Sequence, residues 1–188
     1  MDVVFHTATA SPTAANAHNH ALMRSVNVDG TRNVVEACVA AGVKRLVYTS
    51  SASVVFDGRD LVGADESQPY AAKPLDYYTQ TKIDGERLAL AANGIGGVAV
   101  VALRPSGIFG EGDLLTVPTT IDNARRGKMK YYIGSGRNRM DFTYVGNVAQ
   151  VRGSWWAWGR WGAGREGIEV RARLAPQVEP CQPLILQP

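Results

Sequence analysis

Tyr78 and Lys82 are the two residues whose types and spacing most directly suggest catalytic chemistry. They are four positions apart, so on a helix their side chains share one face, a single turn from each other. A lysine ammonium beside a phenol favours the phenolate and lowers its pKa from about 10, toward the value that a general base needs at neutral pH. The same spacing also arises by chance on solvated helix faces, so the pair alone indicates little.

A cluster of hydroxyl groups supplies the partner that such a base requires. Removing a hydride from an alcohol carbon requires a second group that holds the substrate oxygen, and the segment Thr49-Ser-Ser-Ala-Ser53 offers several candidates. The segment follows a short apolar run, and open α/β sheets bind ligands at the carboxyl ends of their strands. Taken alone, the serines fit a polar strand-to-loop junction. The combination is more specific: Ser51 precedes Tyr78 by 27 residues, Lys82 follows, and another apolar run ends in Arg104-Pro-Ser-Gly107.

These residues are carried by alternating predicted strands and helices. Short apolar runs predict strands at residues 2–6, 45–49 and 97–103, and helical spacing predicts helices at 25–41, 76–93 and 118–126, with a further short strand at 131–133. Gly42 and Gly94 each follow a helix, as C-capping glycines do. This alternation predicts an α/β fold with a doubly wound parallel sheet and helices on both faces.

The composition excludes several other classes of protein. The 188 residues are 45% hydrophobic and 20% charged, which is close to the average of globular domains and excludes a wholly disordered chain. A net charge of +3 is too small to argue for nucleic acid as a partner. Two cysteines exclude a disulfide framework, and no metal-ligand spacing occurs. We find neither an apolar run long enough to span a bilayer nor a secretory signal after Met1, which predicts a protein that is not secreted.

Residues 151–188 differ from the rest of the chain. All four tryptophans fall within residues 155–161, among several glycines, and prolines follow from Pro176 onward. Because glycine weakens regular structure and proline removes backbone donors, we expect 151–188 to be a poorly ordered Trp/Gly/Arg/Pro-rich tail. An interfacial membrane anchor or an RNA-stacking segment would also use Trp and Arg, but the Trp spacing forms no amphipathic stripe.

Over residues 1–150 the sequence resembles the extended short-chain dehydrogenases/reductases, and within them the 3β-hydroxysteroid dehydrogenase family. Seven segments carry the resemblance, in order: Asp2-Val-Val-Phe-His-Thr-Ala8, Asn27-Val-Asp-Gly-Thr31, Val43-Lys-Arg-Leu-Val-Tyr-Thr-Ser-Ser51, Ser53-Val-Val-Phe-Asp-Gly58, Tyr78-Thr-Gln-Thr-Lys82, Leu103-Arg-Pro-Ser-Gly-Ile-Phe-Gly110 and Asp141-Phe-Thr-Tyr-Val-Gly-Asn-Val-Ala149. Within that family, the chain most resembles the plant-type sterol-4α-carboxylate 3-dehydrogenases (decarboxylating).

The resemblance implies a role for each candidate residue. Tyr78 would accept the proton of a steroid or sterol 3β-hydroxyl, Lys82 would bind the nicotinamide ribose, and Ser51 would hold the substrate oxygen. The cofactor, NAD or NADP with NAD favoured by the family, would lie against Thr7, Ala8, Thr49, Pro105 and Ser106, together with Tyr78 and Lys82. Asn27 would sit near the active site on its helix. The resemblance further implies a protein of steroid or sterol biosynthesis, cytoplasmic or peripherally associated with the endoplasmic reticulum.

Two features depart from the family pattern. The family begins with a β-α-β-α-β half carrying Gly-x-x-Gly-x-x-Gly, which binds the pyrophosphate. These 188 residues contain no such segment, and Gly107 to Gly112 cannot replace it. We therefore expect residues 1–150 to form a partial Rossmann domain that lacks its first three strands. At the other end, the resemblance stops after Gln150.

Two alternatives to a sterol dehydrogenase remain open. One is another extended short-chain dehydrogenase activity, such as that of a nucleotide-sugar epimerase or a dihydroflavonol-type reductase. The other is an inactive fragment that acts as a binding partner, self-associating through an exposed strand edge at residues 2–6. An unpaired apolar edge would also make the isolated chain poorly soluble.

Overall fold

The computed structural model describes residues 1–13, 16–130 and 139–158. These residues contain five strands and five α-helices, together with a π-helical segment η1 (Ser25–Asp29) and two short 3-10 turns, η2 (Ala52–Val55) and η3 (Ile95–Gly97). The strands are β1 (Val3–His6), β2 (Arg45–Thr49), β3 (Ala99–Leu103), β4 (Gly107–Phe109) and β5 (Phe142–Tyr144). The helices are α1 (His20–Arg24), α2 (Gly30–Ala40), α3 (Tyr77–Ala91), α4 (Thr116–Arg125) and α5 (Val145–Trp158).

The central sheet confirms the predicted parallel α/β fold. Its order is β1-β2-β3, with Val4 opposite Leu46 and Leu46 opposite Val100. Both pairs are parallel, which requires crossover connections, and α2 and α3 supply them. Strand β1 lies at the edge of this sheet within the described part of the chain. A second, two-stranded parallel sheet joins β4 to β5.

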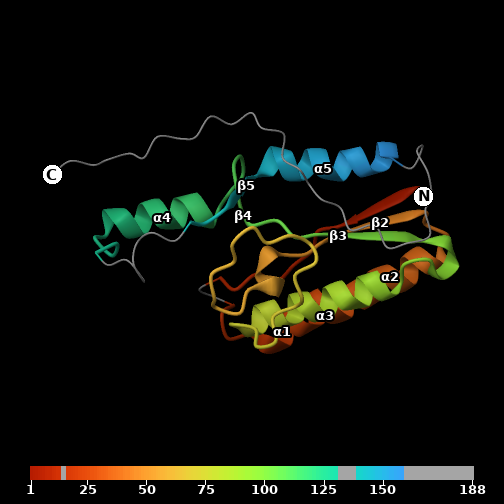
Figure 1. Ribbon diagram of the computed structural model, residues 1–188, viewed down its shortest axis with the longest axis horizontal. Helices are drawn as coiled ribbons and strands as arrows, with labels where there is room; N and C mark the ends of the chain where they lie inside the picture. Colours follow the sequence, from red (N-terminus) through yellow and green to blue (C-terminus); the bar gives the residue numbers. More distant parts are fainter. Residues whose placement is uncertain (14–15, 131–138, 159–188) are drawn as a thin grey trace.

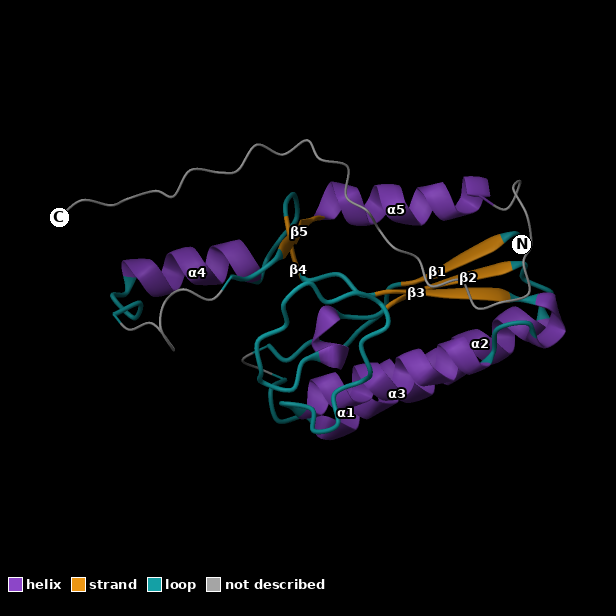
Figure 2. Cartoon of the chain, viewed as in Figure 1, coloured by secondary structure: helices purple, strands orange, loops and turns teal. Residues whose placement is uncertain are grey.

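Helices lie on both sides of the central sheet. Figures 1 and 2 show α1, α2 and α3 together on one side and α5 on the other. The core between the sheet and α2 and α3 contains Val35, Cys38, Leu46, Tyr48, Ala89 and Val98. Val47 and Val101 point to the opposite face and are also buried, at 2% and 5% exposed. Burial on both faces explains why the strand segments read as nearly continuous apolar runs.

The helix expected at residues 25–41 differs from the observed one at its start. Helical structure begins at His20, because the Asn19 side chain accepts a hydrogen bond from the Leu22 backbone amide at 3.0 Å. The helix then loosens into η1 before it continues as α2. Single π-helical turns of this kind are frequent at functional sites. Gly42 ends α2 at a φ of +61°, which confirms the predicted glycine cap.

The expected start of the tail, at residue 151, is also wrong. Helix α5 runs from Val145 to Trp158, so residues 151–158 are helical and not part of an irregular tail. Gly153, which led us to expect disruption, costs a helix only about 1 kcal/mol. Residues 159–188 lie outside the described part of the chain, as does the strand expected at 131–133.

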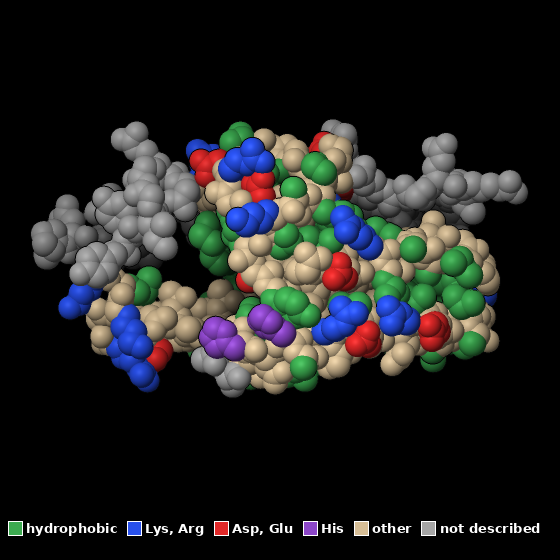
Figure 3. All heavy atoms as spheres, turned by 90° about the horizontal axis from the view of Figure 1, so that it is seen from below, with side chains coloured by type: hydrophobic (Ala, Val, Ile, Leu, Met, Phe, Trp, Pro, Cys, Tyr) green, Lys and Arg blue, Asp and Glu red, His purple; other side chains and the backbone are tan. Residues whose placement is uncertain are grey.

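The surface over α1–α3 mixes both signs of charge. Figure 3 shows lysine and arginine side chains interspersed with aspartate and glutamate on this face, beside two neighbouring histidines. Within the described ranges, no helix combines the length and apolar character needed to cross a bilayer.

Candidate active site

The carboxyl ends of the three parallel strands bring most of the predicted site residues to one edge of the sheet. Thr7 and Ala8 follow β1, Ser51 follows β2, and Pro105 and Ser106 follow β3. Two backbone hydrogen bonds tie the last two ends together. The Ser50 amide donates to the Leu103 carbonyl at 2.7 Å, and the Ala52 amide donates to the Pro105 carbonyl at 3.0 Å. The segments flanking Ser51 and Pro105 are therefore fixed to each other.

Helix α3 carries Tyr78 in its first turn and Lys82 one turn later. The helix begins where the Asp76 carboxylate accepts from the Thr79 amide at 2.7 Å, as an N-cap does. Lys82 is only 2% exposed, and its Nζ donates to the carbonyl of Thr49 at 2.7 Å. The ammonium also lies 4.8 Å from the centre of the Tyr48 ring, within the range of a cation–π contact. Lys82 is thus anchored to the end of β2, next to the serine cluster.

Burial controls the pKa values of both residues. The pKa of Lys82 falls to about 8, because desolvation disfavours the ammonium, while the nearby negative charge of Glu86 opposes that fall. Burial raises the pKa of Tyr78, and an interaction with the Thr9 hydroxyl partly offsets this rise. This direction is opposite to the lowering that the Tyr78–Lys82 spacing led us to expect. The physical reason is that desolvation of the phenol exceeds the stabilisation of its anion.

Ser51 is held in place by its neighbour Ser53. Its Oγ accepts from the Ser53 amide at 3.2 Å and from the Ser53 hydroxyl at 2.9 Å. The Ser51 hydroxyl hydrogen therefore stays available for an oxygen of a bound molecule. Sequence reasoning did not assign a role to Ser53, although the Ser-x-Ser spacing is typical of such local hydrogen bonds. Ser50 is buried, and its Oγ has no partner within the described part of the chain.

Asn27 connects the loop after β1 to helix α3. Its side chain is 1% exposed and pairs with the backbone of Ala10 in both directions, at 2.7 Å and 3.1 Å. The same amide nitrogen donates to the Thr81 hydroxyl at 3.0 Å, and Thr81 lies between Tyr78 and Lys82 on α3. The residue sits in η1, where the π-helical turn occurs. Asn27 therefore holds the segment after Thr7 and Ala8 at a fixed place relative to α3.

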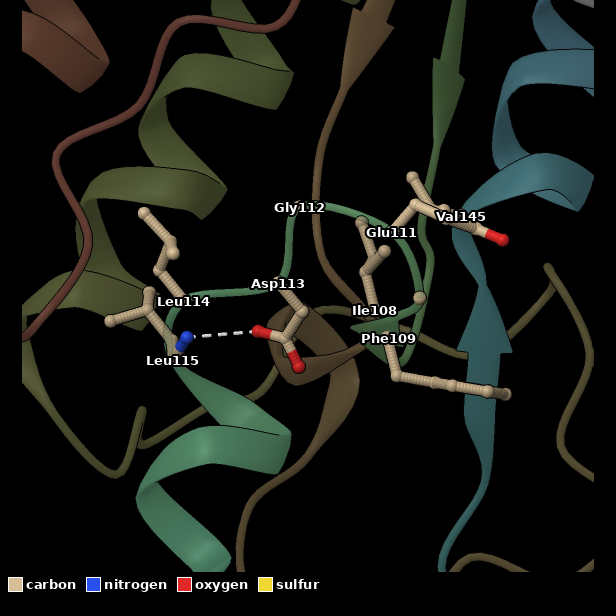
Figure 4. Close-up of a pocket in the computed structure, with 9 residues that line it drawn as sticks. Ile108, Phe109, Glu111, Gly112, Asp113, Leu114, Leu115 and Val145 are labelled. Atoms are coloured by element: carbon tan, nitrogen blue, oxygen red, sulfur yellow. Dashed lines mark hydrogen bonds between the residues drawn. The ribbon is translucent and has the colours of Figure 1, made fainter.

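A pocket of about 470 Å³ lies at the connection between β4 and α4. Figure 4 shows Ile108, Phe109, Leu114, Leu115 and Val145 around it, with the Asp113 carboxylate accepting from the Leu115 amide at the start of α4. Its walls are mainly apolar, as ligand pockets usually are. None of the predicted site residues lines this pocket, and no sequence pattern had indicated it.

The arrangement fits the nicotinamide–ribose end of a dinucleotide. Lys82 has three N–H donors, and within the described residues one of them is used, on the Thr49 carbonyl. A buried ammonium with spare donors suits the hydroxyl groups of a ribose. Thr7 and Ala8 are exposed at the same edge of the sheet. No three His, Cys, Asp or Glu side chains of residues 1–13, 16–130 and 139–158 gather as metal ligands.

Comparison with known proteins gives this site its context. The model of the 3-beta hydroxysteroid dehydrogenase/isomerase family matches residues 1–152. The chain belongs to this family. Among the proteins similar to this chain is the 3beta-hydroxysteroid-dehydrogenase/decarboxylase isoform 1 of Arabidopsis thaliana, which is 53% identical over 151 residues. The human sterol-4-alpha-carboxylate 3-dehydrogenase, decarboxylating, is 49% identical over 149 residues.

These matches cover most of this family member and a smaller part of each relative. The Arabidopsis match spans 80% of this chain and 34% of the relative, and the human match spans 79% and 39%. Among solved structures, MoeE5 in complex with UDP-glucuronic acid and NAD superposes with a TM-score of 0.69 at 31% identity, covering 88% of this chain and 54% of the other. A UDP-galactose 4-epimerase superposes with a TM-score of 0.68 at 25% identity, covering 86% and 52%.

Proposed function

We propose that this chain provides the catalytic residues for NAD-dependent oxidation of a sterol 3β-hydroxyl group, with a 4α-carboxysterol as the substrate. The observation that carries the proposal is the anchoring of buried Lys82 to the Thr49 carbonyl, one helical turn from Tyr78 and beside the serine cluster. The family membership and the activities for which the Arabidopsis and human relatives are named support the substrate class.

Each residue has a distinct task in the proposed reaction. The Ser51 hydroxyl donates to the substrate oxygen and holds it near Tyr78. The Tyr78 Oη takes the proton of the 3β-hydroxyl, and the Lys82 ammonium stabilises the phenolate that this transfer requires. A dinucleotide held by Lys82 and the Thr7–Ala8 and Pro105–Ser106 segments would supply the acceptor for the hydride from C3 of the sterol. NADP would serve the same chemistry, and we favour NAD because it is the dinucleotide in the similar MoeE5 complexes.

The second half of the proposed reaction follows from the product of the first. Oxidation of the 3β-hydroxyl yields a 3-ketone, so a carboxylate at C4 becomes part of a β-keto acid. The bond between C4 and the carboxylate carbon breaks, and carbon dioxide leaves. The electron pair of the broken bond moves toward the ketone oxygen and forms an enolate. Protonation at C4 then gives the 4-demethylated ketone. A donor at the ketone oxygen assists this step, and Ser51 and Tyr78 are the donors that the proposal assigns.

A replacement chimera tests the function. The matched region of the Arabidopsis relative is exchanged for the corresponding residues of this chain, and sterol oxidation is measured as NADH formation. We expect the chimera to oxidise a 4α-carboxysterol and the same chimera with Tyr78→Phe to lose at least about a hundredfold in kcat, in line with the loss of a general base. The matched control is Tyr77→Phe, which changes the neighbouring phenol. Turnover of Tyr78→Phe within tenfold of the parent would disprove the role of Tyr78.

The alternative substrate class is a nucleotide sugar, which is suggested by the UDP-glucuronic acid bound to MoeE5 and by the similar UDP-galactose 4-epimerase. The same chimera distinguishes the two classes, because UDP-glucose and a 4α-carboxysterol can be offered in parallel. The sterol proposal expects turnover of the sterol alone. Turnover of UDP-glucose alone would replace it.

The proposal also includes a partner and a location. Strand β1 lies at the edge of the described sheet and Phe5 is 40% exposed, so we expect isolated chains to self-associate through this edge. Light scattering should show larger species for the 188-residue chain than for its Phe5→Lys variant, and equal masses would contradict this expectation. From its resemblance to enzymes of sterol biosynthesis, we expect the protein in the cytoplasm or peripherally associated with the endoplasmic reticulum. Fractionation of cells that express the tagged protein would test this location.

A further inference from the structure

The most tightly enclosed charge that the proposed reaction does not use is Glu86, one turn beyond Lys82 on α3. Its side chain is 1% exposed. The Oε1 atom accepts from Arg104 Nε at 2.9 Å, from Arg104 Nη2 at 2.7 Å and from the Tyr70 hydroxyl at 3.1 Å. The Oε2 atom is buried and has no hydrogen-bond partner among the described residues. A buried carboxylate in this state is costly, so its presence calls for a compensating role.

The partners of Glu86 come from the segments that surround the proposed site. Arg104 directly precedes Pro105 and Ser106 at the end of β3. Through the Pro105 carbonyl, this segment holds the Ala52 amide next to Ser51. Tyr70 belongs to the connection that leads into α3, and its ring lies 5.2 Å from the Arg104 guanidinium carbon and 4.7 Å from that of Arg87. Glu86 therefore joins α3, the β3 end and the loop before α3 at one point.

The same carboxylate acts electrostatically on Lys82. Groups from three elements act on the Lys82 ammonium or are acted on by it: His6 from β1, Tyr48 and the Thr49 carbonyl from β2, and Glu86 from α3. Arg104, beyond β3, adds a positive charge through its pair with Glu86. Burial lowers the pKa of Lys82, and Glu86 is the carboxylate that raises it. The lowered pKa of His6, which burial and the Lys82 charge both produce, shows that the ammonium acts on its neighbours too.

We propose that Glu86 and Arg104 are positioning residues for the active site: Glu86 keeps Lys82 charged, and Arg104 fixes the Pro105–Ser106 segment against the segment that carries Ser51. The inference rests on the proposed function for its meaning, because Lys82 and Ser51 serve catalysis only if that function holds. Its tests use the 188-residue chain without sterol or dinucleotide. A failure here is therefore separate from a failure of the proposed oxidation.

The first test measures the titration of Lys82 directly. The chain has five lysines, Lys44, Lys73, Lys82, Lys128 and Lys130, so the ¹³Cε signals of a lysine-labelled sample can be assigned, with Lys82→Met identifying its own. In Glu86→Gln, which keeps the shape and an oxygen acceptor for Arg104, we expect the Lys82 titration midpoint to fall by about 1 pH unit or more. The matched control is Asp84→Asn on the same helix, which we expect to leave the midpoint in place. An unchanged midpoint in Glu86→Gln, or an equal fall in both variants, would overturn the electrostatic role.

The second test measures the positioning role and keeps the charge of Arg104. Arg104→Lys loses the two-pronged contact with Oε1 but retains a cation, so it preserves the fold better than removal of the charge. We expect the Ser50 and Ala52 amides, which donate to carbonyls at the end of β3, to exchange with solvent at least about tenfold faster, because their acceptors become less constrained. The Val47 amide, in the middle of β2, should keep its rate. Unchanged protection at Ser50 and Ala52, or a uniform loss that includes Val47, would overturn this role.

Discussion

Replacing Lys82 with methionine should change how the stability of the chain depends on pH. Lys82 is 2% exposed, and burial lowers its pKa from the ordinary 10.5 to about 8. Between these two values the unfolded chain holds a proton that the folded chain has released. The free energy of unfolding contributed by this residue therefore rises with pH from about 8 to 10.5. Methionine has a side chain of similar length and does not titrate, so this contribution disappears in Lys82→Met.

The size of the effect follows from the two pKa values. Each unit of pKa difference corresponds to about 1.4 kcal/mol, so the full window is worth roughly 3 kcal/mol. Most of it, about 2 kcal/mol, is gained between pH 7 and pH 9.5, before the unfolded lysine itself begins to lose its proton. Tyrosine titration opposes this trend nearer pH 10, because burial raises the pKa values of Tyr70 and Tyr78. Both proteins share those tyrosines, so their effect cancels in the comparison.

Urea unfolding at pH 7.0, 8.5 and 9.5 measures the difference. We expect the free energy of unfolding of the parent, minus that of Lys82→Met, to become more positive by about 2 kcal/mol across this range. Lys44→Met is the matched control, because Lys44 is exposed and pairs with Asp2 at the surface. Its difference from the parent should stay constant within error. Parallel pH curves for the parent and Lys82→Met would show that Lys82 titrates normally and would refute the assigned environment.

Three further substitutions and one control test the packing around the site and the start of α4, each by urea unfolding or amide exchange. Gly85→Ala should destabilise the chain by about 2 kcal/mol despite the better helix former, because the added Cβ would lie 2.5 Å from Tyr48 Oη and 2.6 Å from the Asn27 carbonyl oxygen. Gly30→Ala, whose Cβ would meet no atom closer than 3.4 Å, should be neutral or stabilising, and equal effects of the two would contradict the packing described. Asn27→Ala should lower the free energy of unfolding by about 1–3 kcal/mol, because the buried amide and carbonyl of Ala10, in the loop after β1, lose their partner. A decrease of less than about 0.5 kcal/mol would contradict this prediction. Asp113→Ala should lower the free energy of unfolding by about 1 kcal/mol, because the Asp113 carboxylate accepts hydrogen bonds from three backbone amides at the start of α4. Amide exchange should become faster at the start of α4 alone, and unchanged exchange there would contradict this prediction.

The elements that sequence predicted well are those with strong local signals. Strand β2 was predicted at residues 45–49, as observed, because a short apolar run with the β-favouring residues Val47, Tyr48 and Thr49 ends at a serine cluster. Helix α3 lies within the predicted range because Asp76 and Gly94 mark its two ends. The early start of α1 carried a signal, the Asn19 cap, that was not used. Helix α5 continues past the expected boundary, and a single glycine such as Gly153 costs a helix only about 1 kcal/mol.

The parts of the site that sequence could not predict depend on contacts between distant segments. The Lys82–Thr49 hydrogen bond joins residues 33 positions apart, and the Glu86–Arg104 pair joins residues 18 apart. Neither can be inferred without knowing how α3 packs on the sheet. The sign of the Tyr78 pKa shift failed for a related reason, because spacing predicts a neighbouring charge but not the degree of burial. The roles of Ser51, Tyr78 and Lys82 stay predictions until they are tested in a catalytic assay.

The most direct measurement of the proposed reaction follows the hydrogen at C3 of the sterol. A 4α-carboxysterol carrying deuterium at C3 is incubated with NAD and the replacement chimera described above, and the dinucleotide is analysed by mass spectrometry. We predict NADH that is one mass unit heavier, formed together with carbon dioxide, and formation of both products at least about a hundredfold slower in the Tyr78→Phe chimera. Deuterium that stays on the sterol, or transfer in Tyr78→Phe within tenfold of the parent rate, would contradict this prediction.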